Sequence, residues 1–231
     1  MSQTNGFKEE PGATLPASDA ERWIAGTYAI WSEYCGGSCK YLGGYEKTEA
    51  NAGMVAKVLE EDWMVTDHDS GVEMVKYLLE HAGPDGDGEE YDEEFDEGFD
   101  EDGEYDRDGE DFGDEDDEDY DKEYDDDYDD DDECDNYKVD TTAFDYACAC
   151  NMCGRMFIAG YFTREEAMSY ATEAAKKIQE LYGSWAEYFQ EYIFGAAGGS
   201  NMKKLMPFAE AYQKVLCAPE NPVLLDWNTR L

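Results

Sequence analysis

The chain has 231 residues, with 59 Asp plus Glu against 17 Lys plus Arg and a formal net charge of −42. This length allows one ordinary domain or slightly more. The charge argues against direct binding to nucleic acid phosphates or to an anionic membrane, because both require a basic face. Only two histidines are present, which argues against most catalytic and zinc sites that depend on imidazole side chains.

Residues 1–17 contain no basic start followed by an apolar run, so we expect a disordered tail and no secretory signal. No window approaches the roughly 20 apolar residues that a membrane span requires. The seven cysteines are an odd number, and without an export signal they indicate reduced thiols. These features predict a cytoplasmic protein.

Residues 18–83 are predicted to form the N-terminal helical part of a domain. Ser18 begins a first helix and Thr48 precedes a second, since both residue types cap helices well. Ser70, with Glu73 three residues later, predicts the start of a third helix. The apolar residues expected to face the core are Met54, Val55, Val58, Leu59, Val72, Val75, Leu78 and Leu79.

Residues 84–137, the acidic segment, contain 34 acidic and 2 basic residues and no Val, Ile, Leu or Met. Because neighbouring carboxylates repel and little apolar surface is available, we expect this insertion to be disordered and extended. Its aromatic residues recur without a helical or strand period, which suggests low complexity and a tendency to stick to a partner. The predicted partner-binding residues are Asp125, Asp126, Asp127, Asp129, Asp130, Asp131 and Asp132.

One stretch of the acidic segment, residues 104–115, is similar to a calcium-binding loop. Glu104 stands where Asp is expected, and no amphipathic helices flank the stretch. Such matches arise from composition alone in a chain this rich in carboxylates, so we expect at most weak, diffuse binding of divalent cations.

Residues 138–231 are predicted to form the C-terminal helical part of the same domain. A helix from Asp140 or Thr141 to Gly160 is apolar nearly all round, which places it at the centre of the bundle. Arg155 then requires a carboxylate or carbonyl partner, because an unpaired buried charge is costly.

Three further helices follow. Thr163 with Glu166 and Ser184 with Glu187 form capping patterns, and a last helix covers about 202–217. The inward residues expected in the first of these helices are Ala167, Tyr170, Ala171, Ala174, Ile178 and Leu181. The pattern predicts an all-α fold: one compact domain of about seven helices, interrupted by the long disordered insertion.

Residues 160–195 read GYFTREEAMSYATEAAKKIQELYGSWAEYFQEYIFG. This run resembles the C-terminal signature of a bacterial family known as domain of unknown function 1266. The residues that carry the resemblance are Gly160, Tyr161, Thr163, Glu165, Glu166, Ser184, Trp185, Glu187, Tyr188, Tyr192, Gly195 and Trp227. Both predicted helical stretches take part, including Trp23, whereas residues 196–198 depart from the larger or basic residue expected there. The resemblance implies a helical fold and no mechanism.

The cysteines and the histidine at position 68 are weak candidates for chemistry. The pattern C-x-C-x₂-C begins with Cys148 and Cys150, which point about 160° apart on a helix. We therefore interpret these cysteines as small buried side chains and expect no metal or cofactor site. His68 lies between two aspartates and could act as a general base, but aspartates at such a position more often cap a helix. The glycine-rich stretch 35–45 reads as a flexible connection between helices.

Two functional hypotheses remain. The first is a non-catalytic interaction module whose acidic segment attracts a basic protein partner. In a simpler version of this hypothesis, the acidic segment only keeps the protein soluble. The alternative is an enzyme with a helical active site near Arg155, Tyr161 and Trp185. No catalytic residue is predicted with a defined role.

Overall fold

The computed structural model describes residues 12–82, 139–219 and 221–231, and these residues form helices and connecting loops without a strand. The α-helices among them are α1 (Asp19–Thr27), α2 (Ala29–Tyr34), α3 (Glu49–Trp63), α4 (His68–His81), α5 (Thr142–Ala159), α6 (Arg164–Leu181), α7 (Trp185–Ala196) and α8 (Met202–Cys217). Two short 3-10 helices are η1 (Leu42–Gly44) and η2 (Pro222–Leu224). The all-α fold is confirmed. The acidic segment and its expected disorder lie outside the described residues.

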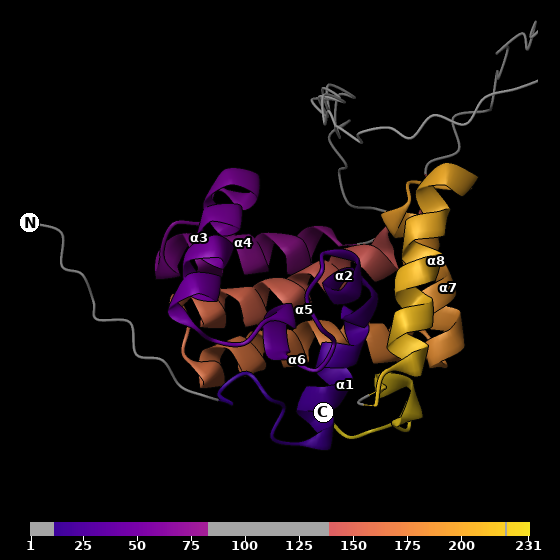
Figure 1. The fold of residues 1–231 in the computed structure, drawn as a ribbon, viewed down its shortest axis with the longest axis horizontal. Coiled ribbons are helices and arrows are strands. Elements are labelled where there is room, and N and C mark those ends of the chain that lie inside the picture. The colour runs from indigo at the N-terminus through magenta and orange to yellow at the C-terminus, as the bar shows by residue number, and fades with distance from the viewer. Residues whose placement is uncertain (1–11, 83–138, 220) are drawn as a thin grey trace, which may run out of the picture. The chain divides into compact units, whose positions relative to one another are not determined.

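Helices from both sides of the acidic segment belong to one compact unit. Its centre is α5, which packs against α1, α3, α4, α6, α7 and η1, and Figure 1 shows it running between them. Fourteen of its eighteen residues are buried, because small side chains alternate with larger apolar ones and leave a surface that neighbours can approach from several directions. The predicted central helix is therefore confirmed.

Helix α8 is held mainly by α2, an element from the opposite end of the sequence, and also contacts α7. The α7–α8 turn lies against the beginning of α5. A Cβ atom on Gly195 would lie 3.0 Å from the carbonyl oxygen of Asp140, and one on Gly199 would lie 3.2 Å from Val139. Figure 1 shows the start of α5 beside the upper end of α8. The chain thus re-enters the described fold next to the first turn of α8.

Several local expectations need correction. Helix α4 begins at His68 with Asp67 as its N-cap, three residues before the predicted cap, because Asp67 and Ser70 satisfy each other in a capping box. Met54 and Leu181 were expected in the core but are 43% and 53% exposed. The predicted tail is too long at its end: the backbone N–H of Leu42 donates to the carbonyl oxygen of Thr14 at 2.7 Å. Residues 1–11 lie outside the described residues.

The glycine-rich connection between α2 and α3 packs tightly against α5 instead of forming a slack linker. A Cβ atom on Gly43 would lie 2.5 Å from the backbone carbon of Gly154, and one on Gly154 would lie 2.4 Å from the backbone nitrogen of Gly43. Gly43 also has a φ of +70°, and its N–H donates a hydrogen bond to the Tyr28 hydroxyl oxygen at 3.0 Å. Glycine is required at both positions because two backbones touch there.

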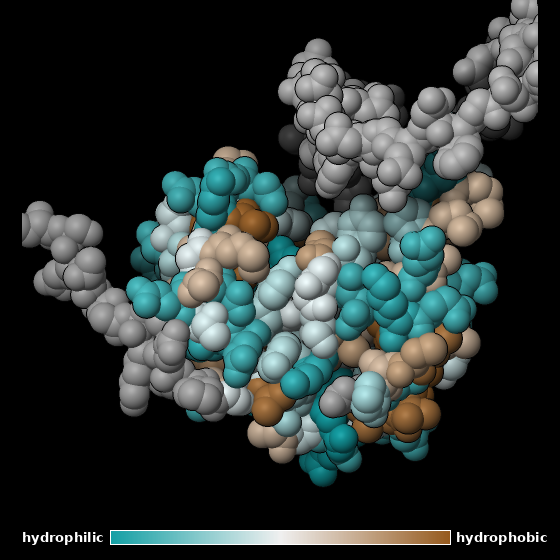
Figure 2. Space-filling model, in the orientation of Figure 1, coloured by the Kyte–Doolittle hydropathy of each residue, from teal (hydrophilic) through white to brown (hydrophobic). Residues whose placement is uncertain are grey.

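A search of the described residues for helices that combine the length and the apolar character of a membrane span found none. On the face drawn in Figure 2, hydrophobic residues gather where the lower end of α8 meets the C-terminal segment. Leu216 and Leu224, which belong to these elements, are 37% and 80% exposed.

Candidate functional site

A pocket of about 450 Å³ opens between α2, α5 and α8. Four aromatic side chains line it on one side, and two lysines lie opposite them. We call the whole site the aromatic pocket. The aromatic side chains are Trp31 and Tyr34 from α2, Phe144 from α5 and Phe208 from α8. The volume lies within the usual range for ligand sites.

The aromatic rings support one another. Tyr34 and Phe208 are stacked with their centroids 4.6 Å apart, and Phe208 also stacks on Trp31 at 6.2 Å. Phe144 meets Trp31 edge to face at 5.6 Å. Trp31 and Phe144 are half-buried and Tyr34 is 46% exposed. Ring surface therefore remains open to an incoming group, in the offset and edge arrangements that aromatic partners favour.

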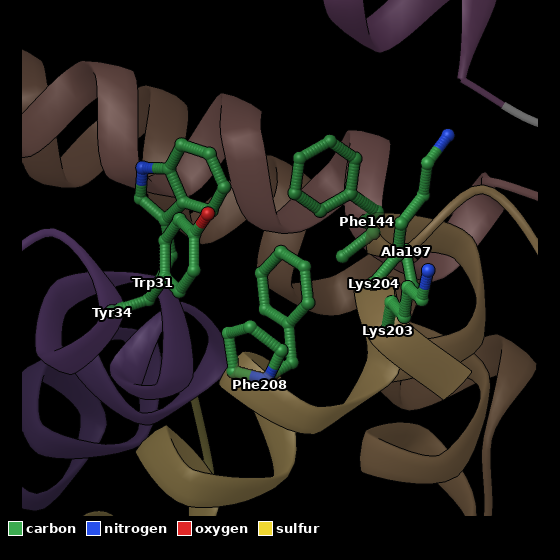
Figure 3. Close-up of a pocket in the computed structure, with 9 residues that line it drawn as sticks. Trp31, Tyr34, Phe144, Ala197, Lys203, Lys204 and Phe208 are labelled. Atoms are coloured by element: carbon green, nitrogen blue, oxygen red, sulfur yellow. The ribbon is translucent and has the colours of Figure 1, made fainter. Parts of the chain in front are cut away.

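Two lysines form the opposite rim of the pocket. Lys203 and Lys204 lie in the first turn of α8, and Figure 3 shows them across Phe208 from Trp31 and Tyr34. Both are exposed, and neither has an ion-pair partner within the described ranges. The first turn of α8 contains no acidic residue, so the lysine charges add to the positive end of the helix dipole. The pocket therefore combines an aromatic wall with a cationic rim.

Sequence reasoning missed this pocket. A usable signal lies in α8, where two adjacent lysines precede an aromatic residue by four or five positions, so that all three fall near one turn of the helix. Trp31 and Tyr34 are likewise one turn apart on α2. Their convergence depends on how α2 and α8 pack, which the sequence pattern does not specify.

A second aromatic group, the tryptophan cluster of Trp23, Trp185, Tyr188 and Trp227, is closed. The Trp23 ring lies 4.9 Å from Trp185 and 5.1 Å from Trp227, by their centroids. All three indoles donate to backbone carbonyl oxygens: Trp23 to Trp227 at 3.0 Å, Trp185 to Leu225 at 3.1 Å, and Trp227 to Tyr182 at 2.9 Å. The cluster joins α1, α7 and the C-terminal segment, and each of its indole N–H groups already donates to the backbone.

Other residues that carry the family resemblance also have structural roles. Gly160 ends α5 with a φ of +86°, and Thr163 and Glu166 form the capping box of α6. Ser184 caps α7, and the carboxylate of Glu187 accepts from the Gly183 N–H at 2.7 Å. Tyr188 is another of these residues, and its hydroxyl donates to the Thr27 carbonyl oxygen at 2.8 Å. Glu165 is exposed in the first turn of α6, and Tyr192 is fully buried.

The three residues of the enzyme hypothesis lie in different surroundings. Arg155 is near Cys35 and Tyr45, and Trp185 belongs to the tryptophan cluster. Tyr161 has Glu60 and Asp67 as its charged neighbours, and burial raises the pKa of its hydroxyl. Within the described residues, the three side chains therefore have separate sets of neighbours.

Arg155 is buried, but no carboxylate in the described ranges forms an ion pair with it, and its Nε has no hydrogen-bond partner there. Neither the carboxylate nor the carbonyl partner that was expected for Arg155 is therefore found within the described ranges. The guanidinium instead lies beside the Cys35 thiol. Burial raises the pKa of Cys35, and the nearby guanidinium partly opposes this rise.

The cysteines of α5 lie mainly in the core. Burial raises the pKa of Cys150 to about 12, and its Sγ contacts the Ala171 carbonyl oxygen at 3.5 Å. Burial also raises the pKa values of Cys148 and Cys153. Such thiols are poor nucleophiles at neutral pH. A search of the described residues found no group of three or more His, Cys, Asp or Glu that could hold a metal ion.

His68 connects two helix starts. Its Nδ1 lies 3.0 Å from a carboxylate oxygen of Asp69, and its Nε2 lies 3.2 Å from a carboxylate oxygen of Glu166 in α6. Hydrogen bonding to these two carboxylates raises the pKa of His68. The ring also meets Phe162 edge to face at 5.5 Å. The His68–Glu166 contact is an exposed ion pair that links α4 to α6.

Comparison with known proteins gives a family but no relative of known activity. Searches of curated proteins and of solved structures each found no significant match. A family model described as "Protein of unknown function (DUF1266)" matches residues 58–215. Trp23 and Trp227, which the sequence resemblance also included, lie outside this range. Because the match covers more than half of the chain, the protein belongs to the DUF1266 family.

Proposed function

We propose that this protein is a non-catalytic interaction module whose acidic segment captures a basic protein partner in the cytoplasm. The observation that carries the proposal is the concentration of 34 acidic against 2 basic residues in residues 84–137. Clustered charge of one sign attracts an oppositely charged protein from a distance and accelerates encounter.

The fold is consistent with separate roles for the acidic segment and the helical body. Helices before and after the acidic segment form one compact unit, and α5, directly after the segment, is the buried centre of that unit. The helical body can therefore serve as a rigid base, while the acidic segment supplies the charge that selects the partner.

The first experiment identifies partners captured from the native host and then measures their binding to purified full-length protein. The test variant changes Asp125, Asp126, Asp127, Asp129, Asp130, Asp131 and Asp132 to Asn. The control variant changes seven exposed acidic residues of α3, α4, α6 and α8 to the matching amides: Glu60, Glu61, Asp62, Glu73, Glu80, Glu173 and Glu210. Both variants lose the same formal charge.

We expect the association rate to fall about tenfold or more in the test variant and much less in the control, and to fall steeply with added salt. Equal losses in both variants would mean that only net charge matters. Partners that bind both variants and the unchanged protein alike, at all salt concentrations, would contradict the proposal and leave the acidic segment with a solubilising role.

A further inference from the structure

The residues that line the aromatic pocket include two cations and no carboxylate. Nine residues line it, and the charged ones among them are Lys203 and Lys204. The whole chain has 59 Asp plus Glu against 17 Lys plus Arg, so the pocket differs in sign from the protein around it. Both lysines are exposed, and neither has an ion-pair partner among the described residues. Their charges therefore favour an anion at this rim.

The opposite side of the pocket favours a flat aromatic ring. Tyr34 and Phe208 are stacked with their centroids 4.6 Å apart, and Phe144 meets Trp31 edge to face at 5.6 Å. Tyr34 is 46% exposed and the Trp31 and Phe144 side chains are half-buried, so parts of these rings remain uncovered. A ligand ring that covers them gains apolar burial and the offset or edge contacts that aromatic pairs prefer.

The other lining residues limit the kind of ring that fits. They are Ala196, Ala197 and Pro207, so the lining offers no amide or carboxylate side chain to a ligand. A nucleobase carries several donors and acceptors around its edge, and burying them without partners costs free energy. A hydrocarbon ring has no such groups. The volume of about 450 Å³ also lies in the lower part of the range for ligand sites, which suits a small molecule.

The charge of the whole chain decides between the common anionic groups. A net charge of −42 repels every anion that approaches, and the repulsion grows with the charge of that anion. A carboxylate carries one negative charge, whereas a phosphate group carries nearly two at neutral pH. Two lysines can bind either group at short range, but a carboxylate loses less to the long-range field.

We propose that the aromatic pocket binds a small aromatic carboxylate, with a hydrocarbon ring against Trp31 and Tyr34 and the carboxylate on the two lysines of the rim. Figure 3 shows these lysines across Phe208 from the two rings, so a short spacer between ring and carboxylate lets both contacts form together. This ligand site is independent of partner capture by the acidic segment.

The first test is calorimetric titration of the unchanged full-length protein with naphthylacetate. Naphthylethanol keeps the aromatic rings but lacks the charge, and decahydronaphthylacetate keeps the charge but lacks the aromatic rings. We expect naphthylacetate to bind at one site. Naphthylethanol should bind about tenfold or more weakly, because the charged hydrogen bonds to the lysines are lost. Decahydronaphthylacetate should bind about threefold or more weakly, because the ring contacts are lost.

A matched pair of lysine variants assigns the charge to the rim. The test variant combines Lys203→Gln with Lys204→Gln. The control combines Lys176→Gln with Lys214→Gln, which removes the same charge from exposed positions outside the pocket lining. We expect naphthylacetate to bind about tenfold or more weakly to the test variant and to change less than about twofold in the control, since distant exposed charges are screened.

A matched pair of tyrosine variants assigns the ring contact. Tyr34→Leu removes a ring of the pocket, whereas Tyr77→Leu removes a ring of similar exposure from α4, 48% against 46%. We expect affinity to fall about threefold or more in Tyr34→Leu and to stay unchanged in Tyr77→Leu. Unfolding curves confirm that both variants remain folded, and the ligand analogues test the same contact on the unchanged protein.

Nuclear magnetic resonance locates the ligand independently of affinity. The chain has five tryptophans, whose indole N–H signals are assigned with Trp→Phe variants. We expect naphthylacetate to shift the Trp31 signal most, because the ring current of the ligand acts at short range. The signals of the closed tryptophan cluster, Trp23, Trp185 and Trp227, should stay in place.

Several results would overturn the proposal. Equal binding of naphthylacetate and naphthylethanol, or equal losses in the two lysine variants, would remove the carboxylate contact. Equal binding of decahydronaphthylacetate, or a largest shift at another tryptophan, would remove the ring contact at this pocket. A dissociation constant above about 10 mM would leave the pocket without such a ligand. None of these results bears on partner capture, which is measured separately with the seven-Asn variant.

Discussion

The molecule contains two aromatic groups that are similar in composition but differ in how they are completed. In the tryptophan cluster, all three indoles donate to backbone carbonyl oxygens and Trp23 has no exposed surface. In the aromatic pocket, ring surface and two lysines remain open. The difference separates aromatic residues that hold segments of the fold together from those available for recognition. Aromatic content alone does not distinguish the two roles; the satisfaction of polar groups does.

The largest effect expected from this comparison is on stability. Trp23→Ala removes a fully buried indole from between α1, α7 and the C-terminal segment and should lower the free energy of unfolding by about 3–5 kcal/mol. Tyr34→Ala in the aromatic pocket removes a ring that is already 46% exposed and should cost about 1 kcal/mol. Urea denaturation of both variants measures the contrast. Equal losses would mean that the pocket is as much a part of the core as the cluster.

Closed and open surroundings also differ for two helical glycines, Gly154 and Gly53. Gly154→Ala places a methyl group 2.4 Å from the backbone nitrogen of Gly43 and should lower stability by about 1–3 kcal/mol or more. Gly53→Ala in α3 is the matched control, because a Cβ there meets nothing within 4 Å and should stabilise by about 0.5–1 kcal/mol. Thermal unfolding should therefore shift in opposite directions. A shift of the same sign would contradict the close approach of η1 and α5.

Local signals account for what could be predicted. Thr163 and Glu166 lie three residues apart, so their capping box could be recognised without knowledge of any other helix. The same logic misplaced the start of α4, because Asp67–Ser70 and Ser70–Glu73 are overlapping cap patterns. In the structure Asp67 accepts the Ser70 N–H at 2.9 Å, and the Ser70 hydroxyl oxygen accepts the Asp67 N–H at 3.1 Å.

Tertiary packing decides what could not be predicted. Trp31, Phe144 and Phe208 come from three helices separated by more than 60 residues at each step. The pocket exists because α2 packs on α8 next to the start of α5, and neither contact has a periodic signature. Arg155 illustrates the same limit, since its expected partner was a carboxylate or a carbonyl and its observed neighbour is the Cys35 thiol.

The smallest expected effect concerns the His68–Glu166 pair, which is neither closed core nor open pocket. Its carboxylate neighbours raise the pKa of His68 above 6.5, so its contribution is fully present below pH 6.5 and is lost as pH rises through the raised pKa. Hydrogen bonds from Thr163 and from His68 lower the pKa of Glu166 below 4.5, so that contribution is lost as pH falls through the lowered pKa. The pair should contribute most between about pH 4.5 and 6.5.

His68→Gln should therefore lower stability slightly within this window and have less effect above it, because both side chains are exposed and water screens the interaction. Urea unfolding midpoints at pH 5.5 and pH 8.5 measure the difference. His81→Gln is the control, since the hydrogen bond and the ring contact of His81 are both with Tyr77 of its own helix. A larger loss at pH 8.5 than at pH 5.5 would show that His68 acts through packing on Phe162, and the link between α4 and α6 would then belong with the closed contacts of the core.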